Sequence, residues 1–162
     1  MLRYAFKEWA IVCEALARGE QTLIFRKGGI SEVGGEFRPD HSRFWLFPTY
    51  LHQKSDGLKP AVADRLPRIE REKPPSEQLV LTHFVEVAQP YFSLRLESLL
   101  ELNSLHVWSE ATVRQRFDYR QPGLFVLPAR VYQVPEPVIV INKPEYEGCK
   151  TWVDLEHDWP IN

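Results

Sequence analysis

The chain has few cysteines and no long apolar segment. Two cysteines, Cys13 and Cys149, are too few for a framework of disulfide bonds. Arg3, Lys7 and Glu8 interrupt the first apolar residues, so the N-terminal sequence does not have the pattern of a signal peptide. No apolar run approaches the ~20 residues that a transmembrane helix needs. We therefore expect a cytoplasmic protein with no membrane partner.

The common signatures of catalysis and metal binding are also missing. There is no G-x-x-x-x-G-K-[ST] phosphate loop and no G-x-S-x-G nucleophile motif. The histidines are scattered without H-x-x-x-H spacing and C-x-x-C is absent, so we expect no metal and no cofactor. A restriction-type nuclease would need an E-x-K tripeptide on a strand to hold Mg²⁺, and none occurs. The sequence therefore assigns no catalytic residues.

Length and composition indicate a single domain, residues 1–162, with a packed core. The chain is 44% hydrophobic and 12% aromatic, which excludes global disorder. Its net charge of −2 excludes a protein that coats DNA through an overall positive field, so a polyanionic partner would have to bind a local basic patch. Polar residues near 67–77 are expected to form a linker or an exposed insertion within the domain.

Hydrophobic periodicity predicts the elements of an α+β fold. Helical spacing is found over Tyr4–Arg18, Leu58–Leu66, Leu94–Leu102 and Glu110–Tyr119, the last capped by Ser109. Strand patterns cover Gln21–Arg26, Phe44–Phe47, Leu79–Ala88, Leu124–Val134, Val138–Asn142 and Thr151–Leu155, and Lys27–Ser42 is expected to be a loop or loose hairpin. Because strands and helices do not alternate regularly, we expect a mixed or mostly antiparallel sheet with an N-terminal helix and about two or three further helices.

A basic pair beside a glycine pair is the clearest candidate site. The predicted strand Gln21–Arg26 leads through Arg26 and Lys27 directly into Gly28-Gly29. Glycine lets the backbone turn sharply and approach a ligand closely, and exposed N–H groups beside two cations can hold a phosphate. The alternative is an ordinary hairpin turn with two solvated cations. We take Arg26, Lys27, Gly28 and Gly29 as candidate ligand-binding residues.

A second group of candidate residues follows the apolar strand Phe44–Phe47. Tyr50, His52 and Gln53 offer an aromatic face, an imidazole and an amide. These groups suit stacking on a base and hydrogen bonding to its edge, so they join the ligand-binding set. The alternative is a polar rim around a core strand. If the protein is an enzyme, His52 or His41 is the candidate general acid or base.

Three blocks of sequence resemble one protein family, and the similarity covers essentially the whole chain. The blocks are K-E-W-A-I-V-C-E-A-L (Lys7–Leu16), R-K-G-G-I (Arg26–Ile30) and F-P-T-Y-L-H-Q (Phe47–Gln53). The chain thereby resembles the cyanobacterial family called domain of unknown function 1802. This resemblance implies no established activity. Some members are associated with a restriction-endonuclease-like domain, which implies a nucleic-acid context, an association with restriction–modification and a nuclease-type protein partner.

A shorter motif resembles the ASCH and PUA-like barrels, in which a helix leads into G-x-K-T-x-x-x-R. The corresponding residues here are G-E-Q-T-L-I-F-R (Gly19–Arg26). Gln21 replaces the usual lysine, which removes a charge that could contact phosphate. The resemblance implies a small PUA-like barrel of a kind that commonly binds RNA or modified bases.

These observations favour a small domain that binds RNA, DNA or a nucleotide without catalysing a reaction. The first alternative is a small metal-independent enzyme that acts on a nucleotide or a phosphorylated metabolite. The second alternative is a protein-interaction module without a ligand. Turnover separates the binding domain from the enzyme, and a ligand-induced thermal shift separates both from the interaction module.

Overall fold

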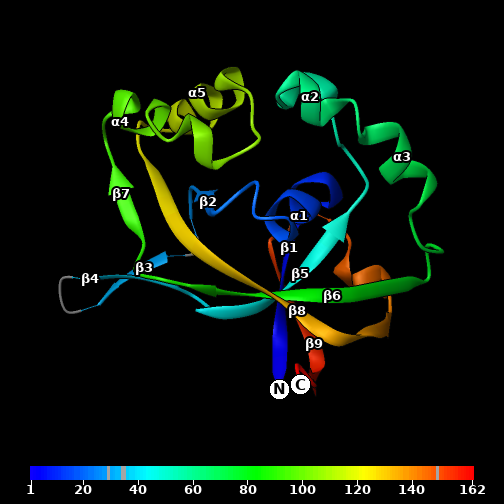
Figure 1. The fold of residues 1–162 in the computed structure, drawn as a ribbon. Coiled ribbons are helices and arrows are strands. Elements are labelled where there is room, and N and C mark those ends of the chain that lie inside the picture. Colours follow the sequence, from blue (N-terminus) through cyan, green and yellow to red (C-terminus); the bar gives the residue numbers. More distant parts are fainter. Residues whose placement is uncertain (29, 34–35, 149) are drawn as a thin grey trace.

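The computed structural model describes residues 1–28, 30–33, 36–148 and 150–162. Its strands are β1 (Leu2–Trp9), β2 (Leu23–Arg26), β3 (Ile30–Val33), β4 (Glu36–Pro39), β5 (Arg43–Thr49), β6 (Gln78–Val87), β7 (Tyr91–Ser93), β8 (Leu124–Ile141) and β9 (Trp152–Trp159). Its α-helices are α1 (Ala10–Ala17), α2 (Pro60–Ala63), α3 (Leu66–Arg71), α4 (Leu96–Leu100) and α5 (Glu110–Asp118). The helices gather on one side of a curved sheet, and the two chain ends lie together on the other side (Figure 1).

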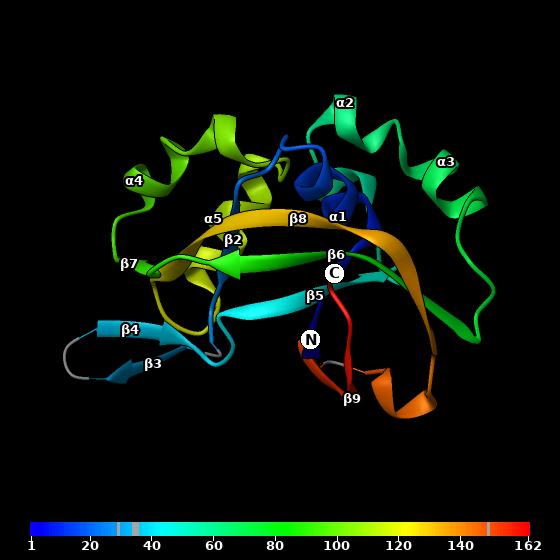
Figure 2. The same cartoon turned by 60° about the horizontal axis from the view of Figure 1, so that its bottom comes forward.

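One mostly antiparallel sheet organises the described part of the chain. Its seven strands follow the order β2-β8-β6-β5-β1-β9, with β7 also paired to β8. Only β1 and β5 are parallel neighbours within this sheet as described, and the long strand β8 pairs with β2 and β7 at its start and with β6 farther along. β3 and β4 form a separate hairpin that projects beside the sheet (Figure 2). The expected α+β fold with a mostly antiparallel sheet is confirmed.

Apolar clusters lie on both faces of the sheet. Along β5, Phe44 and Leu46 belong to the cluster beneath the helices, whereas Trp45 and Phe47 belong to the opposite cluster. Successive side chains of a strand point to opposite faces, so these four residues contribute to both clusters. All four side chains are buried. The apolar run after the predicted loop is therefore core, and it positions the polar residues that follow it.

The N-terminal segment corrects one prediction. Residues Tyr4–Arg18 do not form a single helix, because β1 extends to Trp9 and only Ala10–Ala17 is helical. β1 pairs with β5 on one side and with β9 on the other, and its Ala5 and Phe6 enter different apolar clusters. Spacing of three and four residues in an apolar segment fits a helix, but pairing with two strands distant in sequence outweighed that local preference.

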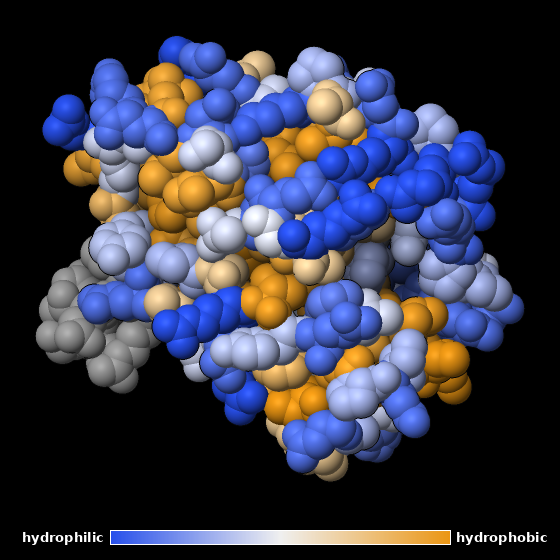
Figure 3. All heavy atoms as spheres, in the orientation of Figure 1, coloured by the Kyte–Doolittle hydropathy of each residue, from blue (hydrophilic) through white to orange (hydrophobic). Residues whose placement is uncertain are grey.

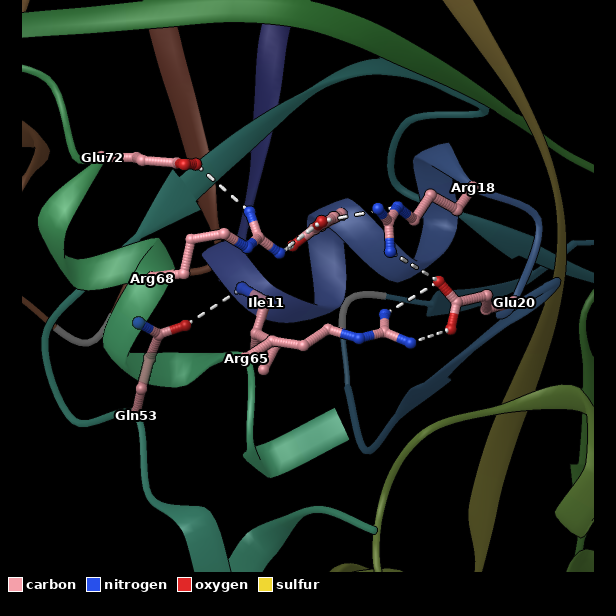
Figure 4. A network of polar contacts seen from close by, with 8 residues as sticks. Ile11, Arg18, Glu20, Gln53, Arg65, Arg68 and Glu72 are labelled. Atoms are coloured by element: carbon pink, nitrogen blue, oxygen red, sulfur yellow. Dashed lines mark hydrogen bonds and ion pairs between the residues drawn. The ribbon is translucent and has the colours of Figure 1, made fainter. Parts of the chain in front are cut away.

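Helices α2 and α3 connect β5 to β6 and pack beside α1. α3 occupies the first part of the segment expected as a linker or insertion, and a proline stands in the first turn of each helix, where its missing N–H costs nothing. Arg65 bonds Glu20 at 2.7 Å and Arg68 bonds Glu14 at 2.8 Å (Figure 4). These ion pairs and the buried Ile69 hold the segment with α2 and α3 against the rest of the fold. In the described ranges, no helix is long and apolar enough to cross a membrane.

The surface over α2 and α3 differs in polarity from the surface near β7 and α4. Hydrophilic side chains predominate over α2 and α3, whereas hydrophobic side chains reach the surface near β7 and α4 (Figure 3). The exposed apolar residues near β7 and α4 include Tyr91, Phe92 and Leu94, at 65%, 41% and 68% of their full exposure. The polar surface over α2 and α3 agrees with the ion pairs that hold these helices.

Candidate functional site

A pocket of about 510 Å³ opens between the sheet and α5. It lies where the last residues of β1 and β2 and the first residue of β8 meet the second half of α5. Its volume falls within the range of roughly 300–1,000 Å³ that is typical of small-molecule sites. The residues that line it are Phe6, Lys7, Glu8, Phe25, Arg26, Lys27, Gly28, Gln115, Arg116, Tyr119, Leu124 and Thr151.

Three charged side chains reach this pocket from three different elements. Glu8 lies near the end of β1, Arg26 ends β2, and Arg116 lies in the last turn of α5. The start of α5 is fixed by Ser109, whose hydroxyl oxygen accepts the backbone N–H of Thr112 at 3.2 Å. This cap matches the sequence prediction, and it sets which turn of α5 faces the sheet.

The electrostatic balance of the pocket is positive. Arg26, Lys27 and Arg116 are cationic lining residues, and Glu8 is the single acidic one among those described. Lys7 also lines the pocket, but its ammonium lies 5.6 Å from the ring centroid of Phe47, in the apolar cluster on the other face of the sheet. Burial lowers the pKa of both Arg26 and Arg116, while the nearby carboxylate of Glu8 opposes this shift. Burial also raises the pKa of Glu8, although Arg116, the N–H of Trp9 and Arg26 oppose that shift. Guanidinium groups that are partly removed from water bind anions strongly, so the pocket suits a negatively charged ligand.

Aromatic rings hold both guanidinium groups in place. The guanidinium carbon of Arg116 lies 4.0 Å from the ring centroid of Trp108. That of Arg26 lies 5.1 Å from the ring centroid of Phe6, and its Nε donates to the carbonyl of Gly28 at 3.2 Å. A cation–π contact uses the face of the guanidinium and leaves the N–H groups in its plane available. The two arginines are thus positioned while most of their hydrogen-bond donors remain available to a ligand.

Lys27 has a structural partner on α5. Its ammonium donates to the carbonyl oxygens of Phe117 at 2.6 Å, Gln121 at 2.5 Å and Gly123 at 2.5 Å. An ammonium has three donors, so these bonds engage all of them. Its positive charge lies at the C-terminal end of the helix, where the helix dipole favours a cation. Lys27 therefore joins β2 to the end of α5, and its effect on a ligand acts through its charge.

The glycine pair is described only in part. Gly28 is exposed and lines the pocket, and a Cβ atom built on it would meet no atom within 4 Å. The protein around it therefore leaves open space beside its backbone. Gly29, the other member of the predicted pair, lies outside the described residues.

The second predicted group lies apart from this pocket. Tyr50 lines a smaller pocket of about 290 Å³ between α1, α3 and the sheet. The side-chain oxygen of Gln53 accepts the backbone N–H of Ile11 at 3.0 Å, which caps the start of α1 (Figure 4). His52 is exposed, with a positive φ of 66°. The structure therefore separates Tyr50, His52 and Gln53 from Arg26, and their part in ligand binding stays a prediction.

The histidines proposed as general acid or base also lie elsewhere. His41 stacks on Tyr4 with ring centroids 3.9 Å apart, and burial lowers its pKa. Neither His41 nor His52 is among the residues that line the two pockets. Within the described ranges, no group of three His, Cys, Asp or Glu side chains is placed to hold a metal ion.

Sequence reasoning missed the two residues that complete the charged pocket. Both lie in segments with helical spacing, Glu8 in Tyr4–Arg18 and Arg116 in Glu110–Tyr119, and neither belongs to the predicted ligand-binding set. The one local signal is a carboxylate directly before the apolar run Trp9–Cys13. No spacing rule links it to Arg116, because the two residues meet only through the fold.

The residue that departs from the ASCH-type motif has an internal role. Gln21 is 1% exposed, donates to the carbonyl of Leu23 at 2.9 Å and accepts the N–H of Val107 at 3.2 Å. These bonds satisfy a buried amide and tie the start of β2 to the segment before α5. Gln21 does not line the pocket.

The curved, mostly antiparallel sheet and the helices on one of its faces define a small α+β fold (Figure 1). The crystal structure of ASCH from Zymomonas mobilis is similar, with a TM-score of 0.49, 16% identity and coverage of 78% of this chain and 66% of that one, which is less than two thirds of its length. Two mutants of the same protein give TM-scores of 0.50 and 0.51, identities of 15% and 13%, and coverage of 83% of this chain and 73% and 72% of theirs. At such low identity the likeness shows the fold alone, and it confirms the expected ASCH-like fold.

The chain belongs to the family described as Domain of unknown function (DUF1802), whose model matches residues 5–161. This match confirms the resemblance carried by the three sequence blocks. Among curated proteins, no sequence matches the chain.

Proposed function

We propose that the protein binds a nucleotide, either free or within single-stranded nucleic acid, in the pocket between β1, β2 and α5, without catalysing a reaction. One observation carries this proposal. Two guanidinium groups from separate elements, those of Arg26 and Arg116, line one pocket of nucleotide size in a chain whose net charge is −2. A positive pocket on a slightly acidic protein is the local basic patch that a polyanionic ligand requires.

The lining offers contacts for both parts of a nucleotide. Arg26 and Arg116 can each donate paired N–H groups to phosphate oxygens. Tyr119, at the end of α5, lines the same pocket and is 57% exposed, so its ring can stack on a base. Gly28 leaves space for a phosphate to approach the backbone. The ASCH-like fold supports the same direction, because the motif resemblance implies RNA binding for barrels of this kind.

The test is a titration of labelled single-stranded RNA and DNA with the whole chain at several salt concentrations. Arg26→Met keeps the aliphatic stem and removes the charge. It is expected to weaken binding and to lower the slope of log affinity against log salt by about 0.7 for each phosphate that the variant no longer neutralises. Arg114→Met is the matched control, since Arg114 is exposed on α5 and pairs with Glu110 at 2.7 Å away from the pocket.

Two outcomes would contradict the proposal. The first is a wild-type protein that binds neither labelled strand nor any free nucleotide at low salt. The second is an equal decrease of affinity in Arg26→Met and Arg114→Met, which would indicate diffuse attraction to the surface rather than a pocket. Circular dichroism and thermal melting of each variant show whether the fold is retained.

A metal-independent enzyme acting on a nucleotide is the second candidate, and Glu8 is the observation that favours it. Burial raises the pKa of this carboxyl inside a charged pocket, which is the condition of many general acids and bases. Incubation of the protein with free nucleotides and with RNA, followed by chromatography, distinguishes the two candidates. A product that forms with wild type and is absent with Glu8→Gln would favour the enzyme.

A nuclease-type protein partner and a cytoplasmic location stay predictions.

A further inference from the structure

The carboxylate in the basic pocket is the feature that phosphate binding does not explain. Glu8 repels an anion, and burial raises its pKa, so its presence beside two arginines weakens the site for phosphate alone. One of its oxygens, Oε1, accepts the backbone N–H of Trp9 at 2.8 Å, which fixes the orientation of the carboxylate. The described residues place no donor on Oε2. A carboxylate has about four acceptor positions, so several remain for a ligand.

The two arginines are not equivalent toward Glu8. Arg116 opposes the raised pKa of Glu8 more strongly than Arg26 does, and its guanidinium carbon lies 4.0 Å from the ring centroid of Trp108. Arg26 instead donates to the carbonyl of Gly28, an exposed residue, so it lies nearer the open side of the pocket. Glu8 and Arg116 thus form an inner pair of acceptor and donor groups, and Arg26 remains for the phosphate.

Base chemistry determines which nucleotide such a pair can recognise. An ionised carboxylate only accepts hydrogen bonds, whereas a guanidinium only donates them. Guanine carries two adjacent donors, N1–H and the N2 amino group, beside two acceptors, O6 and N7. Adenine and cytosine place a single amino donor next to an acceptor, and uracil places its N3–H between two acceptors. Guanine is therefore the one standard base that offers two adjacent donors to a carboxylate and two acceptors to an arginine.

We propose that the pocket selects guanine: Glu8 accepts hydrogen bonds from N1–H and the N2 amino group, while Arg116 donates to O6 and N7. Tyr119 stacks on the base, and Arg26 binds the phosphate. This inference rests on the proposed nucleotide-binding function and names the base that the same site prefers. It also gives the Glu8 carboxylate a role that a general phosphate site lacks.

The experiment compares the 5′-monophosphates of guanosine, inosine, adenosine, cytidine and uridine by isothermal titration with the wild-type chain. Guanosine monophosphate is expected to bind about 5- to 150-fold more tightly than the adenosine, cytidine and uridine compounds, the usual discrimination of a bidentate pair. Inosine lacks only the N2 amino group, so its affinity is expected to fall between these limits. This comparison needs no mutant.

Glu8→Gln then tests the carboxylate itself. Glutamine keeps the size and one acceptor oxygen, but it presents an amino donor where guanine also presents donors. The variant is expected to lose the preference for guanine and, because the charge that repels the phosphate is gone, to bind the other nucleotides more tightly than wild type. Glu110→Gln, on the exposed part of α5, is the matched control and is expected to keep the preference.

The outcomes separate this inference from the function on which it rests. Equal binding of all five nucleotides by wild type, or guanosine and inosine compounds that bind alike, would refute guanine selection and leave nucleotide binding in place. A guanine preference that survives in folded Glu8→Gln would also refute it. Binding of none of the nucleotides and of no RNA would refute both proposals together.

Discussion

Lys27→Met is expected to loosen the end of α5. Methionine keeps the length and apolar character of the lysine stem and removes the ammonium. The carbonyl oxygens of Phe117, Gln121 and Gly123 would each be deprived of a charged donor at 2.5–2.6 Å. Water can replace part of these bonds, because the ammonium is partly exposed, so the three effects do not add.

The expected cost is about 1–3 kcal/mol in the free energy of unfolding, the range for hydrogen bonds to a charged group after allowance for this exposure. For a chain of this size each 1 kcal/mol lowers Tm by about 2–4 °C, so a decrease of about 2–12 °C is expected. Differential scanning calorimetry measures it. Lys54→Met is the control, because Lys54 is an exposed lysine that does not line either pocket.

The same variant tests the assignment of Lys27 against that of Arg26. If Lys27 is a structural anchor, Lys27→Met should lower Tm more than Arg26→Met and should reduce the salt dependence of RNA binding less. The reverse order would refute the reasoning: an unchanged Tm together with a flattened salt dependence would mean that the ammonium contacts phosphate directly.

Two other substitutions test the stability of the same region. Burial raises the pKa of Glu8 above its value in the unfolded chain, so the ionised group opposes folding. Glu8→Gln should therefore be more stable than wild type at neutral pH. This difference in stability should vanish as the pH falls through the raised pKa and below the ordinary carboxyl range. Urea unfolding at several pH values measures this, and a less stable variant at neutral pH would show that the arginines outweigh burial. Gln53→Ala removes the acceptor for the N–H of Ile11 at the start of α1 and should cost about 1 kcal/mol with no change in nucleotide affinity. A weaker affinity at unchanged Tm would instead return Gln53 to the binding site.

Local patterns predicted the elements that depend on local chemistry. The strand over Leu79–Ala88 corresponds to β6, and the helix that begins after Ser109 corresponds to α5. In both, alternation or capping was visible within a few residues. β1 was missed because its apolar residues fit a helical spacing equally well, and its partners β5 and β9 come much later in the chain.

The candidate site was predicted where its residues are adjacent in sequence. Arg26, Lys27 and Gly28 form one segment, and all three line the pocket. Glu8 and Arg116 come from distant segments, and no short motif records that the fold brings them together. Tyr50 was placed wrongly with Arg26 for the same reason: no short motif records that the fold puts Tyr50 in a different pocket. The side-chain chemistry of Arg26 and Tyr50 suggested a common ligand site, and the order of strands in the sheet was needed to show that the two residues lie apart.

The position of β1 between β5 and β9 has a consequence for the order of folding. β1 is synthesised well before β9 (Trp152–Trp159), its antiparallel partner, and Thr151 also lines the basic pocket. Such distant pairing gives slow folding, because the entropy of closing a long loop must be overcome before the contacts form. During synthesis, one edge of β1 therefore stays unpaired until β9 has left the ribosome. We expect the pocket around Glu8 to be among the last parts of the protein to become structured.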